Sequence, residues 1–66
     1  MEQMKLTETV KSVKTNGYEI VMLKTLFNEF YIAYESEGVA IKSEPFYSYE
    51  IASSYFDSKR LELEGH

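Results

Sequence analysis

The chain lacks cysteine and tryptophan, and its 66 residues include one proline, three glycines and one histidine, which is the last residue. Without cysteine or an internal histidine, the sequence excludes a disulfide scaffold and a zinc finger. No apolar run approaches the roughly 20 residues of a membrane span, and no charged-then-apolar signal peptide opens the chain. We therefore expect a protein that stays in the cytoplasm and away from membranes.

Basic residues are scarce as well. Seven Lys and Arg stand against eleven Asp and Glu, which gives a net charge of −4 at pH 7. Adhesion to nucleic acid or to an anionic membrane without sequence specificity needs a basic excess. The composition therefore argues against both partners, although it leaves room for a local basic patch.

Aromatic residues are abundant, with six Tyr and four Phe in a chain that is 44% hydrophobic. A domain of this size buries only about 60% of the surface that its unfolded chain exposes, so large side chains must supply most of the core. We expect one small domain over residues 1–63. We interpret the closing Glu-Gly-His of residues 64–66 as an affinity-tag remnant.

Turn signals divide the first two thirds of the chain into strands. Asn16-Gly17 predicts a type I′ turn with positive φ at both residues, and Asn28-Glu29 and Glu37-Gly38 each separate two apolar runs. Pro45 closes the last run. These marks predict a four-stranded antiparallel meander with strands at about 6–14, 18–26, 30–36 and 39–44.

Two-residue hairpins at these turns have mutually consistent registers. The first opposes Val13 with Ile20, the second opposes Leu23 with Tyr34, and the third opposes Tyr34 with Ile41. A register error would move a whole strand to the other face of the sheet. The predicted apolar face collects Leu6, Val10, Val21, Leu23, Phe27, Phe30, Ile32, Tyr34, Val39 and Ile41.

The period changes after the proline. Ser48 is a suitable N-cap, Glu50 suits the positive end of a helix dipole, and Lys59-Arg60 suits the negative end. An amphipathic helix over about 49–60 follows, and it packs on the apolar sheet face. Its stripe consists of Ile51, Ala52, Tyr55 and Phe56, and we expect residues 61–63 to continue as a tail. The fold class is therefore α+β.

The first segment has an alternative. Leu6, Val10 and Val13 also fit the i, i+4, i+7 spacing of a helix, which would give a fold with an N-terminal helix, three strands and a C-terminal helix. Thr7 and Thr9 favour β structure. We prefer the strand for this reason and because its register agrees with the others.

The sequence carries no pattern typical of an enzyme. Seven serines have no cysteine or internal histidine as a partner, and the glycines stand singly, unlike a phosphate-binding loop. Glu35, Glu37 and Glu44 form the one acidic cluster, which is typical of a solvated sheet edge. We predict no catalytic residue, no cofactor and no metal site.

The second sheet face holds the predicted functional residues, because strand two is apolar on both faces at Ile20-Val21-Met22-Leu23. We predict a protein–protein interface, either a homodimer or a contact with another protein. Its candidate residues are Val13, Ile20, Met22, Leu26, Tyr31 and Ala33. Scattered apolar residues on an ordinary surface are the plain alternative.

The same face suggests a second hypothesis, a platform for single-stranded nucleic acid. Tyr31 would stack on a base while lysines meet phosphates, with Lys11, Lys24 and Lys42 as the candidate contacts. Three strands followed by a Ser48-capped helix are also similar to the double-stranded-RNA-binding-like fold of small antitoxins, in fold only and without a shared motif. An acidic antitoxin-like or inhibitor-like partner protein is the third hypothesis.

Overall fold

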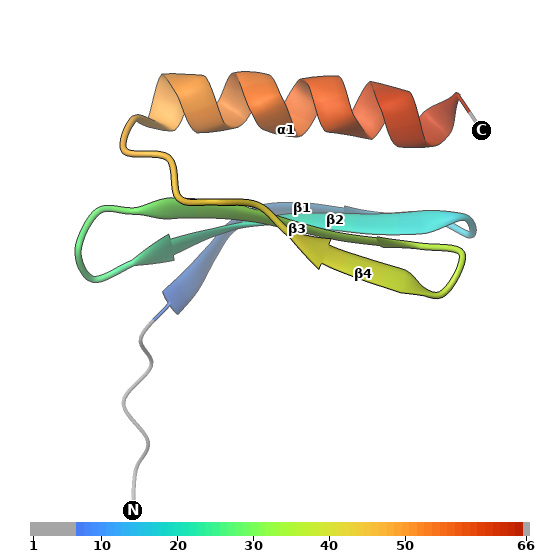
Figure 1. Ribbon diagram of the computed structural model, residues 1–66, viewed down its shortest axis with the longest axis horizontal. Helices are drawn as coiled ribbons and strands as arrows, with labels where there is room; N and C mark the ends of the chain where they lie inside the picture. The colour runs from blue at the N-terminus through green and yellow to red at the C-terminus, as the bar shows by residue number, and fades with distance from the viewer. Residues whose placement is uncertain (1–6, 66) are drawn as a thin grey trace, which may run out of the picture.

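The computed structural model describes residues 7–65, which form one antiparallel sheet with strand order β1-β2-β3-β4 and one helix. The elements are β1 Thr7–Lys14, β2 Tyr18–Thr25, β3 Phe30–Ser36, β4 Val39–Lys42 and α1 Tyr49–Glu64. Figure 1 shows α1 lying along one face of the sheet, with no element on the other face. The predicted α+β meander is confirmed. The alternative with an N-terminal helix is wrong, because residues 7–14 are a strand.

The type I′ turn lies elsewhere than predicted. Glu37 and Gly38 have φ values of 55° and 81°, which is the type I′ requirement. Neither Asn16 nor Gly17 has a positive φ. The first turn is held by Thr15, whose Oγ1 accepts the backbone N–H of Gly17 at 3.1 Å and of Tyr18 at 3.1 Å. A threonine hydroxyl thus organises this turn.

The second hairpin has a longer loop than predicted. Thr25 N–H donates to the Glu29 carbonyl at 2.9 Å, and Asn28 is left-handed with a φ of 61°. This makes a three-residue loop, Leu26–Asn28, that ends in a left-handed residue. Leu23 consequently pairs with Tyr31 instead of Tyr34. A shift by an odd number of residues turns β2 over relative to β3.

The core therefore takes the even-numbered residues of β2. Ile20, Met22 and Ile32 have no exposed surface, and they lie under Ala52 and Phe56 of α1. Val21 and Leu23, predicted to face the helix, face away from it instead. Phe27, predicted for the same face, is 80% exposed in the loop. The remaining core members are Tyr18 and Phe30.

Strand β1 contains a bulge. Thr9 pairs with Leu23 and Lys11 pairs with Met22, so Val10 is an extra residue in the ladder. The bulge lets Val10 pack against the core as predicted, although the register around it shifts. Leu6, which was predicted to begin this strand on the apolar face, lies outside the described residues.

Helix α1 is longer than predicted. Ser48 caps it by accepting the Ile51 N–H at 3.4 Å, and the helix continues through the Leu-Glu-Leu-Glu segment to Glu64. Leu and Glu are good helix formers, which explains the extension. Glu64 accepts a hydrogen bond of 2.8 Å from the Tyr18 hydroxyl, so this residue belongs to the packed domain. Within the predicted stripe, Ile51 is exposed.

Candidate interaction surface

No other element of the described residues covers the face of the sheet away from α1. The pairing places Val21 and Leu23 of β2 beside Ala33 and Tyr31 of β3 on this face. All four side chains are half-buried by their neighbours. We call these four residues and Ala40 of β4 the open-face patch.

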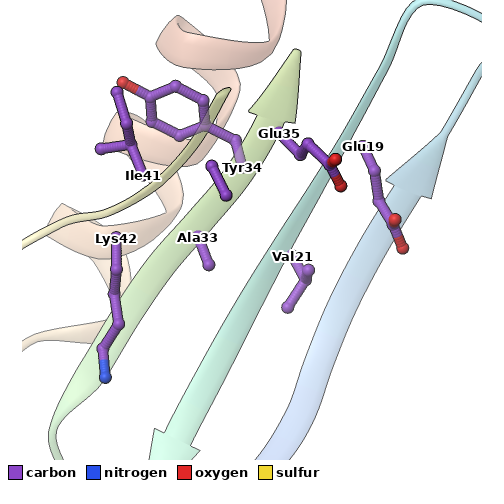
Figure 2. Close-up of a pocket in the computed structure, with 8 residues that line it drawn as sticks. Glu19, Val21, Ala33, Tyr34, Glu35, Ile41 and Lys42 are labelled. Atoms are coloured by element: carbon purple, nitrogen blue, oxygen red, sulfur yellow. The ribbon is translucent and has the colours of Figure 1, made fainter. Parts of the chain in front are cut away.

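The patch contains a hollow of about 330 Å³ between β2, β3 and β4. Figure 2 shows Val21 and Ala33 at its floor; Tyr34 and Ile41 line its β4 side, although by register their side chains belong to the helix face of the sheet. Val39 and Ile41 of β4 stay exposed on the helix side, because α1 packs on β2 and β3 and does not extend over β4. The hollow is therefore apolar and open to solvent.

Charges lie at opposite ends of the hollow. Glu19 and Glu35 are directly paired across β2 and β3 and project at one end, whereas Lys42 projects at the other (Figure 2). Lys42 Nζ lies 4.5 Å from the centroid of the Tyr31 ring, which is a cation–π contact. The open-face patch therefore has an acidic end and a basic, aromatic end.

Three of the predicted interface residues do not lie on this face. Ile20 and Met22 are fully buried beneath α1, and Val13 packs against the same core. The reason is the β2–β3 register. Once β2 is turned over, Ile20 faces the helix, and Val13 of β1, which pairs with Ile20, faces the same side. Their predicted placement on the open face was wrong.

The other three predicted interface residues remain accessible. Tyr31 and Ala33 lie on the open face as predicted, and Leu26 lies in the β2–β3 loop with 64% of its surface exposed. Sequence reasoning missed Val21 and Leu23. The signal that could have found them was Asn28, because asparagine is among the residues that most readily adopt the left-handed conformation at the end of a three-residue loop.

The predicted nucleic-acid contacts are divided between the two faces. Lys11 points to the helix side, where Nζ donates to Ser53 Oγ at 3.0 Å, and Lys24 pairs with Phe30 in a row that also faces α1. Lys42 and Tyr31 alone meet on the open face. The four residues therefore do not form one basic surface, and Glu19 and Glu35 lie at the other end of the hollow from the pair that remains.

The C-terminal half of the helix is attached to the sheet by polar contacts. Burial raises the pKa of the Tyr18 phenol, and the hydrogen bond to the Glu64 carboxylate raises it further. Lys59 donates to Glu62 at 2.6 Å, which raises the pKa of the lysine, and its Nζ lies 5.1 Å from the Tyr34 ring centroid. These groups support packing and do not face the open-face patch.

Within residues 7–65, no group of three or more His, Cys, Asp or Glu side chains is arranged to hold a metal ion. No helix in that part of the chain is long and apolar enough to cross a membrane. Comparisons of the chain with protein-family models, curated proteins and solved structures gave no match. The candidate site therefore has to be interpreted from its own geometry.

Proposed function

We propose that the protein is a non-catalytic interaction module that self-associates through the open-face patch. The observation that carries this proposal is the position of Val21, Leu23, Tyr31 and Ala33, which form a continuous apolar surface on the uncovered face. Antiparallel sheets that face water normally place polar residues on that side. An apolar patch in this position is typical of a protein contact.

A second copy of this chain fits the charges of the patch. The open face carries a basic residue, Lys42, as well as the acidic residues Glu19 and Glu35, so two copies in opposite orientations can meet without bringing like charges together. In a homodimer with a two-fold axis, the same patch of each copy forms the interface. The patch must therefore be complementary to itself.

The test is the oligomeric state in solution, measured by light scattering at about 20 µM and about 1 mM protein. We expect dimers that the Leu23→Glu variant converts to monomers with an unchanged circular dichroism spectrum. The matched control is Ile51→Glu, which places the same charge at an exposed apolar residue on the outer side of α1. A wild-type protein that remains monomeric at both concentrations would contradict the proposal.

A second candidate function is a single-strand nucleic-acid platform, which the cation–π pair of Lys42 and Tyr31 favours. The carboxylates at the other end of the hollow and the net charge of −4 oppose it. Fluorescence anisotropy of labelled single-stranded DNA or RNA at about 50 mM salt distinguishes the two functions. Binding that Lys42→Ala weakens would support the platform, and the absence of binding would leave the interaction module.

A further inference from the structure

The β2–β3 loop carries the most exposed aromatic residue among residues 7–65. Phe27 is 80% exposed and the neighbouring Leu26 is 64% exposed. The loop extends beyond the start of α1 at one end of the sheet and bends to the side away from the helix (Figure 1). Two large apolar side chains in this loop are therefore mostly exposed among the residues that the structure describes.

The loop is held in one conformation by hydrogen bonds. Thr25 Oγ1 accepts the Phe27 N–H at 3.1 Å and the Glu29 N–H at 3.3 Å. The Asn28 N–H donates to the Thr25 carbonyl at 3.3 Å, and Asn28 itself is left-handed. A loop held in this way loses little conformational entropy when it binds, so its side chains are effective anchors.

The open face is small, and an additional contact would enlarge a dimer interface. With strands about 4.8 Å apart and a rise of about 3.3 Å per residue, the strand residues give this sheet a flat face of roughly 430 Å². A standard stable interface buries about 800 Å² on each partner. Stacking the flat faces alone falls short of that area, whereas a contact that also includes Leu26 and Phe27 extends it by two large side chains.

We propose, on the basis of the self-association proposed above, that Leu26 and Phe27 of each copy insert into the hollow of the other copy. The Leu23–Tyr31 pair lies midway between the loop and the hollow, because Phe27 is four residues beyond Leu23 and Glu19 is four residues before it. Each interval spans about 13 Å. A two-fold axis that passes between the Leu23–Tyr31 pairs, across the strands, therefore places each loop over the Glu19–Glu35 end of the partner's hollow, next to the Val21–Ala33 floor.

The same arrangement satisfies the charges. Lys42 pairs with Ala33, which is two residues after Tyr31, and Glu29 is two residues before Tyr31. The two-fold axis brings Lys42 of one copy to the level of Glu29 of the other. It also places the Glu19–Glu35 pairs of the two copies at opposite ends of the dimer, so like charges stay apart.

The direct test is an isotope-filtered NMR experiment on a mixture of labelled and unlabelled protein. Phe27 and Val21 lie six positions apart, about 20 Å along an extended strand, so a nuclear Overhauser contact between them can arise only between copies. We expect cross-peaks from the Phe27 ring to the Val21 and Ala33 methyl groups. A dimer in which neither methyl group shows a contact with Phe27 overturns the inference.

Variants distinguish this inference from the broader proposal. Phe27→Ser should weaken dimerisation at least tenfold with an unchanged fold, while Leu61→Ser, which alters an exposed leucine on the helix, should not. If Leu23→Glu separates the copies but Phe27→Ser does not, the open face is the interface and the loop insertion is wrong. A wild-type monomer overturns both.

The charge pair gives an independent readout. Lys42→Glu should weaken dimerisation, and adding Glu29→Lys in the same chain should restore it, because the exchange recreates the ion pair between copies. If the double variant dimerises no more strongly than Lys42→Glu alone, the proposed orientation of the two copies is wrong.

Discussion

Lys11 Nζ donates a hydrogen bond of 3.0 Å to Ser53 Oγ and thereby joins β1 to α1 across 42 positions of the sequence. The same ammonium group lies 4.8 Å from the centroid of the Phe56 ring. The main packing of α1 is against β2 and β3. Lys11 is therefore a polar link between the helix and the edge strand.

We expect Lys11→Met to destabilise the domain by about 1–2 kcal/mol. Methionine keeps the apolar stem of the side chain but removes the hydrogen bond and the cation–π contact. Urea unfolding followed by circular dichroism measures the change. Lys14→Met is the matched control, because Lys14 is an exposed lysine on the same strand. Equal unfolding midpoints for the two variants would show that the link contributes nothing.

Adjacent residues of β2 should respond oppositely to the same substitution. Met22 is fully buried under α1, whereas Leu23 faces away from the helix. Met22→Glu should cost about 4 kcal/mol or more, close to the whole stability of a domain this small, because it puts a carboxylate in the core. Leu23→Glu should leave the fold intact. A one-dimensional proton NMR spectrum separates the outcomes, and a folded Met22→Glu protein would refute the register.

The third turn should be more sensitive to alanine than the first. Gly38 has a φ of 81°, while Gly17 lies outside the left-handed region, and both have open space where a Cβ would be added. Gly38→Ala should therefore cost roughly 1–2 kcal/mol through backbone strain alone. Gly17→Ala should change the free energy of unfolding by much less. Thermal melts of the two variants compare them directly, and a larger loss for Gly17→Ala would contradict the turn assignment.

The Tyr18–Glu64 contact should make stability fall at high pH. The pKa of Tyr18 is raised by folding above the ordinary value of 10.0, so its contribution is complete below pH 10 and is lost as the pH rises through the folded value. We expect the free energy of unfolding to decline more steeply between about pH 9 and about pH 11 in the wild type than in Tyr18→Phe. Parallel slopes for the two proteins would exclude this linkage.

The sequence predicted the elements well because turn signals and polarity changes mark their ends. Strand β3 has the predicted bounds, and the pairing of Tyr34 with Ile41 is confirmed, since Glu37-Gly38 forms a two-residue turn. Tyr31 and Ala33 were assigned to the correct face because the predicted register between β3 and β4 was correct. The predicted pairing of Val13 with Ile20 is also confirmed.

The face of β2 could not be predicted from its own residues. Ile20-Val21-Met22-Leu23 is apolar on both sides, so alternation does not indicate which side is buried, and the length of the following loop decides the matter. The prediction assumed a loop of two residues, and it therefore assigned the buried side of β2 to the surface and the exposed side to the core. Five of the predicted site residues were misplaced as a result: Val13, Ile20, Met22, Lys11 and Lys24. The bulge at Val10 carries no glycine or proline that would mark it.

The strand order β1-β2-β3-β4 has a consequence for how the chain folds. Every strand pairs with its neighbour in sequence, so each hairpin closes a short loop before any distant contact is needed. Such local topologies fold faster than sheets with crossovers. Helix α1 packs on β2 and β3, so its docking site exists only after the central hairpin has formed. We therefore expect the central hairpin to form the folding nucleus and the helix to dock late, after the rate-limiting step.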